Sequence, residues 1–355
     1  MELGEEREAL RDAVRGLLAG YSTRSAIEAP AGYDAGLWAR LCKEIGVAGL
    51  AVPEEYGGAG ATLRETHVVL EELGRTLTPG PMLGCGVLAA QALLRCGDPD
   101  DRARLLPGIC AGERIAALAW NAEDPEAVPF TAVPGRGLTG EARYVLDVEA
   151  ADTLLVAAAD ADGLALYEVD GAAAGVDRRA ASPLDLTRRL GVLRLDGTPG
   201  RRLGSAGPLR GLRDVACVAL SADQVGAASR ALELTIEYAK AREQFGRPIG
   251  SFQALQHRLA EAHVRVAAAR SASWAAADAL VAGASAAPAL AAVAKVYCSE
   301  TLQAVAGEMV QMHGGIAITW EHDAHLYLRR AYASAQLFGA PGRHVERLAA
   351  SLLPA

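Results

Sequence analysis

The stretch from Tyr238 to His257 reads YAKAREQFGRPIGSFQALQH and concentrates side chains that are suited to holding a ligand. Arg242 presents a fixed fork of N–H donors that matches a pyrophosphate, and Gln244 can both donate and accept hydrogen bonds. Phe245 and Phe252 can cover a flat ring system. The stretch therefore has the residues that a phosphorylated ligand with an aromatic ring would need.

Helical patterns lie on both sides of this stretch. Before it, Leu232, Ile236 and Ala239 form one apolar stripe, which runs out at Gly246 and Pro248. After it, a second stripe follows at steps of four, three and four residues, through Leu255, Leu259, Ala262 and Val266. Further helices are predicted over residues 289–313 and 323–337. Four long helices with short connections predict an antiparallel bundle for residues 208–355.

The rest of the chain divides into two blocks. Residues 1–113 again have helical spacing, for example at Leu37, Leu41 and Ile45, with turn clusters between the helices. Residues 114–207 instead contain short runs, such as RYVLDV and LALYEVD, separated by Gly, Asp and Pro. This pattern predicts short antiparallel strands in a small barrel or sandwich. The expected fold is mostly α, with an N-terminal helical domain, a middle β domain and a C-terminal four-helix bundle.

Composition excludes several classes of function. The 355 residues carry a net charge of −8, which repels phosphate backbones and argues against a nucleic-acid partner. The six cysteines form no C-x-x-C pair, so no metal site is predicted, and they suit a reducing compartment. The charged N-terminal stretch lacks the apolar region of a secretion signal, and no run reaches the ~20 apolar residues of a membrane span. A cytoplasmic protein is expected.

The stretch quoted first resembles the second signature of the acyl-CoA dehydrogenases, roughly YA-x-x-R-x-Q-F-G-x-P-I-x-x-F-Q-x-x-Q-H. A second resemblance is QMHGGIAITWEHDAHLYLRRA (residues 311–331), which is similar to the Q-x-x-G-G segment of the family and the helix after it. A third is GVAGLAVPEEYGGAG (residues 46–60), followed by EELGR (residues 71–75). The family also has the same order of domains, so the resemblance covers nearly the whole chain.

The resemblance implies FAD as cofactor and an acyl thioester, on CoA or on a carrier protein, as substrate. In the family a carboxylate removes the α-proton, a hydride passes to the flavin, and electrons go on to an electron-transfer flavoprotein. Each matching residue by itself would be a surface charge, a core ring or a helix stop. Taken together, the residues that the resemblance assigns to FAD, partly across a subunit interface, are Arg242, Gln244, Phe245, Phe252, Gln253, Gln311, Gly314 and Gly315.

The sequence departs from the family at the catalytic base. Of the two positions where family members place the glutamate, one holds Phe338 and the other holds Ala216. Asp223 is the nearest substitute, on the same helix face as Ala216, but seven residues of helix separate them by about 10 Å. Two roles stay open for Asp223, a proton acceptor or a buried structural carboxylate. The flavin loop also differs and reads AWNAEDPEA (residues 119–127), where Trp120 and Asn121 could contact a flavin or simply pack.

Four hypotheses follow from these departures. The chain could be a homomeric dehydrogenase, a dimer or a tetramer, with an unusual base. It could instead be the shorter subunit of a hetero-tetramer, because its ending SAQLFGAPGRHVERL resembles the shorter chains of heteromeric acyl-CoA dehydrogenases that degrade steroid side chains. In those assemblies the longer partner supplies the base. A non-catalytic scaffold and an oxygen-consuming flavoprotein are the other two possibilities.

Overall fold

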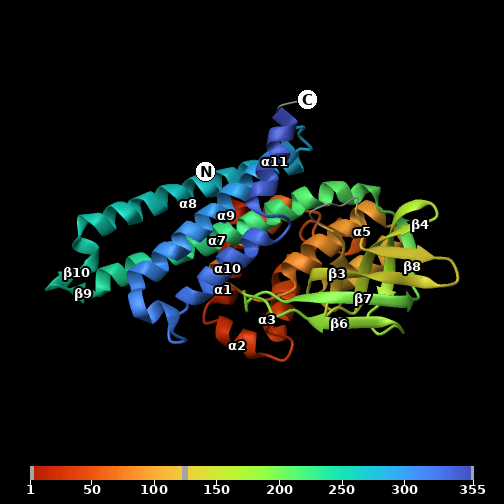
Figure 1. Cartoon of the computed structure of the whole chain (residues 1–355), viewed down its shortest axis with the longest axis horizontal. Coiled ribbons are helices and arrows are strands. Elements are labelled where there is room, and N and C mark those ends of the chain that lie inside the picture. The colour runs from red at the N-terminus through yellow and green to blue at the C-terminus, as the bar shows by residue number, and fades with distance from the viewer. Residues whose placement is uncertain (1–3, 122–126, 353–355) are drawn as a thin grey trace.

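The computed structural model describes residues 4–121 and 127–352, in which helical and stranded regions follow one another along the chain (Figure 1). Helical elements fill the first part, strands the middle and long helices the rest, which confirms the predicted fold class. The α-helices of the first part are α1 (Glu5–Leu18), α2 (Thr23–Glu28), α3 (Ala35–Arg40), α4 (Leu63–Arg75), α5 (Ala90–Cys96) and α6 (Pro99–Cys110).

Local sequence explains where the N-terminal helices begin. Thr62 and Glu65 form a capping box at the start of α4, since each side chain satisfies a free backbone N–H group of the first turn. At the start of α6 the Asp98 carboxylate accepts a hydrogen bond from the Asp101 N–H at 2.8 Å, and Pro99 occupies the first helical position. Between α4 and α5 lies the apolar π-helical element η4 (Met82–Ala89), which is nearly all buried.

The helix α4 crosses the long helix α7 (Leu212–Ala241) at two glycines. A Cβ atom on Gly74 would lie 2.1 Å from the carbonyl oxygen of Asp223, and one on Gly226 would lie 1.9 Å from that of Glu71. Only glycine allows backbones to approach so closely. The EELGR segment thus joins the N-terminal helices to the C-terminal bundle.

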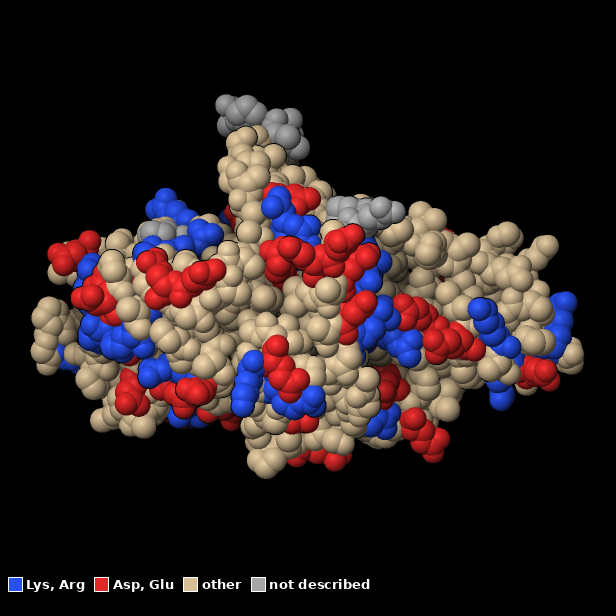
Figure 2. All heavy atoms as spheres, turned by 180° about the vertical axis from the view of Figure 1, so that it is seen from behind, with Lys and Arg blue, Asp and Glu red and all other residues tan. Residues whose placement is uncertain are grey.

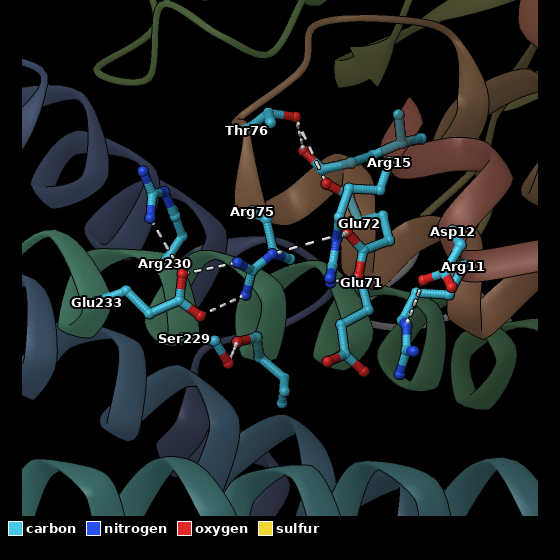
Figure 3. Close-up of polar contacts among 12 residues, drawn as sticks. Arg11, Asp12, Arg15, Glu71, Glu72, Arg75, Thr76, Ser229, Arg230 and Glu233 are labelled. Carbon is cyan, nitrogen blue, oxygen red and sulfur yellow. Dashed lines mark hydrogen bonds and ion pairs between the residues drawn. The ribbon is translucent and has the colours of Figure 1, made fainter. Parts of the chain in front are cut away.

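Ion pairs also join α4 to its neighbouring helices near this crossing (Figure 3). The guanidinium of Arg75 donates to both carboxylate oxygens of Glu233 on α7, at 2.8 and 2.7 Å. On the other side of α4, Arg15 from α1 donates to the buried Glu72 at 2.7 Å. Such bidentate pairs fix geometry as well as charge.

The middle region is one eight-stranded sheet in the order β6-β7-β3-β2-β4-β5-β8, with β1 also paired to β4. Most neighbours are antiparallel, as predicted, but β1 and β2 each run parallel to β4 and share one of its edges. The expectation of an antiparallel sheet is wrong at those two pairs, because long connections let the chain return in the same direction. The strands are β1 (Ala116–Ala119), β2 (Phe130–Val133), β3 (Gly137–Leu146), β4 (Thr153–Asp160), β5 (Gly163–Asp170), β6 (Val176–Ala180), β7 (Leu190–Thr198) and β8 (Arg201–Ser205).

The C-terminal helices pack around α7 and α9, as the apolar stripes predict. The interior is rich in alanine, which lets helices approach closely, and α7 is buried on nearly every side in its first half. The tip between α7 and α8 is a small hairpin of β9 (Glu243–Gln244) and β10 (Arg247–Pro248). The other helices are α8 (Gln253–Val281), α9 (Ala287–His313), α10 (Ala324–Gln336) and α11 (Pro341–Leu352).

The surface carries mixed charge. On the face in Figure 2, basic and acidic side chains are interspersed among neutral ones. Within the described residues, none of the helices combines the length and the apolar character that crossing a membrane requires.

Candidate active site and cofactor-binding surface

A pocket of about 740 Å³ lies where the three regions of the chain meet. Gly84 and Leu88 of η4 contribute from the N-terminal region, and the segment from Glu141 to Leu146 of β3 contributes from the sheet. The bundle contributes the end of α10 and the corner after it, from Gln336 to Phe338. Trp120 and Asn121 also line the pocket, whereas residues 122–126 of the predicted flavin loop lie outside the described residues.

Phe338 forms part of the wall in a strained conformation. Its φ angle is +62°, which a bulky side chain rarely adopts, and its side chain is buried. His344 holds this corner, because its Nε2–H group donates to the carbonyl oxygen of Phe338 at 3.0 Å. Burial lowers the pKa of His344 to about 4, so the ring is neutral at physiological pH. The apolar ring therefore has a fixed place in the pocket.

The two positions where a glutamate would be expected have different surroundings. Phe338 lines the pocket, whereas Ala216 is fully buried in the core and is not among the lining residues. Among the described lining residues, the one carboxylate is that of Glu141, which sequence reasoning did not single out. Glu141 is partly exposed and accepts a hydrogen bond from Arg143 at 2.9 Å.

Asp223 lies outside this pocket. It borders a separate small cavity and accepts hydrogen bonds from Arg330 at 2.7 Å and from Arg188 at 3.0 Å. Burial alone would raise the pKa of Asp223, but the two guanidinium groups outweigh it and lower the pKa below its usual range. This geometry favours the structural role of Asp223 over the role of a proton acceptor.

Three residues of the stretch from Tyr238 to His257 lie at the β9–β10 tip, namely Arg242, Gln244 and Phe245. Phe245 and Gly246 both have positive φ angles, +53° and +74°, as in a two-residue type I′ turn. The turn presents Phe245 to solvent with 92% of its surface exposed, and Arg242 and Gln244 are exposed beside it. Phe252 lies edge-on to Phe245 at 6.2 Å. An aromatic ring held in a strained turn and left exposed suits contact with another molecule.

The second cofactor segment reaches the same end of the bundle. His313, at the end of α9, stacks on Tyr238 of α7 with 4.2 Å between ring centroids. Gly314 and Gly315 follow at once, both exposed, and a Cβ atom on either would meet open space. Gln253 and Gln311 are also exposed. The residues predicted for FAD are thus accessible side chains and glycine backbone, which a flat ligand could approach.

The surface that is predicted to bind the cofactor and the pocket lie in different parts of the molecule. In Figure 1 the β9–β10 tip is at one end of the long helices, whereas β3 and β7 of the sheet are toward the other. The structure brings the residues predicted for FAD together with one another but not with the pocket. This separation agrees with a site whose two halves come from different subunits.

Sequence reasoning missed two residues beside the pocket. Tyr144 lies where β3 shifts register against β7, has a φ angle of +58° and exposes 67% of its surface at the pocket. Asp147 comes directly after β3. Burial raises the pKa of Asp147 to about 7, although the positive charges of Arg188 and Arg189 act to lower it. Nothing in the RYVLDV run marked these two as unusual, since the bulge and the burial arise from pairing with distant segments.

Lys295 was also missed, although its position gave a signal. It interrupts an alanine-rich tract and is fully buried. Its Nζ donates to Ala335 O at 2.8 Å and to Ser334 O at 3.1 Å, the last carbonyl groups of α10. A cation at a helix C-terminus is favourable, and burial lowers the pKa of Lys295 to about 8. Lys295 thus fixes the helix end that carries Phe338 into the pocket.

Comparison with known protein families gives two matches. Residues 4–113 match the acyl-CoA dehydrogenase N-terminal domain, and residues 214–353 match the acyl-CoA dehydrogenase C-terminal domain. Together they cover most of the helical parts of the chain. The sequence resemblance is thereby confirmed.

Whole-chain relatives agree. The acyl-CoA dehydrogenase IpdE2 of Mycolicibacterium smegmatis is 41% identical over 354 residues, which cover 99% of this chain and 100% of the relative. Among solved structures, the steroid ACAD Tcur3481-Tcur3483 is 35% identical with a TM-score of 0.89, covering 99% of this chain and 98% of that one. The ChsE4-ChsE5 complex from Mycobacterium tuberculosis is 30% identical with a TM-score of 0.91, covering 100% and 99%. The chain belongs to the acyl-CoA dehydrogenase family of flavoprotein oxidoreductases, which act on CH–CH bonds.

Proposed function

We propose that this chain takes part in the FAD-dependent α,β-dehydrogenation of an acyl thioester, carried on CoA or on a carrier protein, in the cytoplasm. Electrons would pass to an electron-transfer flavoprotein. Family membership supports the reaction class, and the six buried free cysteines fit a reducing compartment.

The exposed residues at the β9–β10 tip and after α9 would hold FAD. Arg242 would pair with the pyrophosphate, Gln244 and Gln253 would hydrogen-bond polar edges, and Phe245 would cover a ring. Gln311, Gly314 and Gly315 would let the cofactor approach the backbone. The flavin supplies the hydride acceptor when bound. These side chains lie far from this chain's own pocket, so the cofactor would belong largely to a neighbouring subunit.

The base would come from a partner. The observation that carries this part is Phe338, an apolar ring fixed in the pocket where related enzymes place a glutamate. A phenylalanine cannot accept the α-proton, and Asp223 is engaged by two arginines. We therefore favour a hetero-tetramer in which a longer family member supplies the carboxylate. One structural relative is likewise a complex of two proteins, ChsE4 and ChsE5.

A homomeric dehydrogenase is the second candidate function. Its support is the pocket itself, which is open, contains the carboxylate of Glu141 and retains Trp120 and Asn121. In that case Glu141, or Asp223 after a rearrangement, would have to act as the proton acceptor.

The visible spectrum of the protein distinguishes the two candidates. We would purify the chain alone and also together with a longer family member, then add a panel of acyl-CoAs without oxygen. The hetero-tetramer predicts a colourless or unbleachable protein alone and a yellow complex whose flavin bands bleach with substrate. A yellow protein that bleaches by itself would establish the homomeric enzyme instead. A colourless protein in both preparations would favour a non-catalytic scaffold, and bleached flavin that recolours rapidly with oxygen alone would favour an oxidase.

A further inference from the structure

We propose that Asp223 is a positioning residue in a buried ion network that fixes the β6–β7 loop (residues 181–189) as one wall of the pocket. The network, here called the interdomain latch, consists of Asp185, Thr187 and Arg188 from the loop, Asp223 from α7 and Arg330 from α10. The inference rests on the proposed function only for the identity of the ligand in the pocket.

The loop needs an anchor of this kind. Its first four residues, Ala181 to Leu184, line the pocket, and Ser182 and Leu184 are largely exposed. The loop has no regular secondary structure, so side chains must hold it. Asp185 and Thr187 are the two buried residues of the loop, at 1% and 2% exposure, and both contact Arg330.

Arg330 is the centre of the latch. Its Nε lies 2.8 Å from the carboxylate of Asp185 and donates to Thr187 Oγ1 at 3.0 Å. Its Nη2 donates to the carbonyl oxygen of Thr187 at 3.2 Å. The guanidinium is 2% exposed, so these contacts form away from water, where electrostatic interactions are strong. A single side chain of α10 thus holds both the backbone and the side chains of the loop.

Asp223 completes the latch from the other helix. One carboxylate oxygen accepts from Arg330 at 2.7 Å and the other accepts from Arg188 at 3.0 Å. The two arginines and the two aspartates balance in charge. Removing Asp223 leaves Arg188 without its carboxylate partner, and removing either aspartate leaves Arg330 with one carboxylate in place of two. The protein can relieve this charge imbalance only by moving the loop or admitting water. The bundle and the loop are therefore coupled through Asp223.

The location of Asp223 separates this role from that of a proton acceptor. Asp223 borders the small cavity together with Arg188 and Arg330, and it is not among the residues that line the pocket. A residue there influences the pocket through the position of the loop and does not contact the reacting atoms.

Asp223→Asn and Asp185→Asn test the latch as a pair. Both remove one carboxylate of the network, but Asp185 belongs to the loop and has no role as a base. Asp177→Asn is the matched control, because Asp177 pairs with Arg179 on the exposed surface of the neighbouring strand β6. Brief digestion of each purified protein with subtilisin, with cleavage sites mapped by mass spectrometry, reports on residues 181–189. Steady-state kinetics with acyl-CoA on the catalytically complete assembly gives KM and kcat separately.

The latch predicts at least tenfold faster cleavage within residues 181–189 in both variants and parent behaviour in the control. It also predicts a KM at least fivefold higher in both variants, with kcat within a factor of three of the parent. Unchanged cleavage or an unchanged KM would overturn the proposal, as would a loss of kcat confined to Asp223→Asn, which would identify a base. If the parent assembly has no dehydrogenase activity while the cleavage result holds, the proposed function fails and the fixing of the loop stands.

Discussion

At the scale of single residues, Phe338 lines the pocket, and Asp147 directly follows Leu146, another lining residue. Phe338 places an apolar ring on the wall in a strained backbone conformation that His344 holds. Asp147 lies just behind the wall, beside Gly84, where a Cβ atom would come within 2.4 Å of its carboxylate. The side chain of Phe338 cannot accept a proton, and burial raises the pKa of the Asp147 carboxyl group to about 7.

Restoring a carboxylate at Phe338 should increase activity. In the assembly that binds flavin, Phe338→Glu is expected to raise acyl-CoA turnover at least tenfold, because general-base catalysis typically contributes about 10²–10⁴ in rate. Flavin bleaching in single-turnover mixing measures the effect. Phe338→Gln has a similar shape without a base and is expected to show no gain. Ala216→Glu is expected to unfold the core, at a cost of several kcal/mol, since Ala216 is fully buried. A gain with Gln, or none with Glu, would contradict the assignment of this position.

Asp147→Asn should stabilise the protein in a pH-dependent way. Burial raises the pKa of Asp147 to about 7, whereas in the unfolded chain it has its ordinary value near 4. Between these values the folded state binds a proton that the unfolded state has lost, so stability falls as pH rises from about 4 to about 7. The asparagine removes this penalty.

We therefore expect Asp147→Asn to gain about 2–4 kcal/mol at pH 8 and almost nothing at pH 4.5, as measured by urea unfolding. The parent protein at each pH is the reference. A difference that is the same at both pH values would refute the assignment of the raised pKa to Asp147.

At the scale of elements, the crossing of α4 over α7 and the end of α10 control how the three regions fit. Gly74 and Gly226 allow the two helices to touch, and Arg75 with Glu233 closes the contact (Figure 3). Lys295 satisfies the last carbonyl groups of α10 from inside the bundle. The α4–α7 contact and the hydrogen bonds of Lys295 both join elements that are distant in sequence.

Two helix glycines should respond in opposite directions to alanine. Gly226→Ala is expected to destabilise the protein by at least about 3 kcal/mol, because its Cβ atom would lie 1.9 Å from the backbone oxygen of Glu71. Gly307→Ala, on the exposed face of α9 with nothing within 4 Å, is expected to stabilise it by about 0.5–1 kcal/mol. Thermal unfolding of both variants provides the test. Similar effects of the two substitutions would mean that the helices do not cross at Gly226.

At the scale of the whole molecule, the separation of the pocket from the exposed β9–β10 tip is the main feature. In the function proposed above, each chain would carry the surface for one cofactor half-site and, at a distance, a pocket for another. Such a molecule would complete its sites only in an oligomer. The side chain of Phe245 at this tip is a large apolar group that is 92% exposed, whereas basic and acidic side chains are interspersed over the face in Figure 2.

Substitutions at the tip should affect the oligomer and leave the isolated chain unchanged. Phe245→Ala and Arg242→Ala are expected to shift the melting temperature of the isolated chain by less than about 1 °C, because both side chains are exposed. In the assembly they should weaken flavin retention about tenfold or more, measured as the flavin-to-protein ratio after gel filtration. Arg179→Ala, another exposed arginine, is the control. Full flavin retention by both tip variants would exclude a cofactor role for this surface.

The sequence by itself determined the element types, their order and the family, because apolar periodicity, turn residues and dense local motifs all act over short distances. The assignment of Phe338 and Ala216 to the two glutamate positions, the boundaries at residues 113 and 207 and the FAD contacts stay predictions.

Only the tertiary structure decided which distant residues meet. It placed Phe338 on the pocket and Ala216 in the core, and it paired Asp223 with Arg330, 107 residues away. It also made β1 and β2 parallel to β4 and buried Lys295 at the end of α10. These pairings depend on how whole elements pack and on which charged groups are buried away from water. A local sequence pattern gives no information on either.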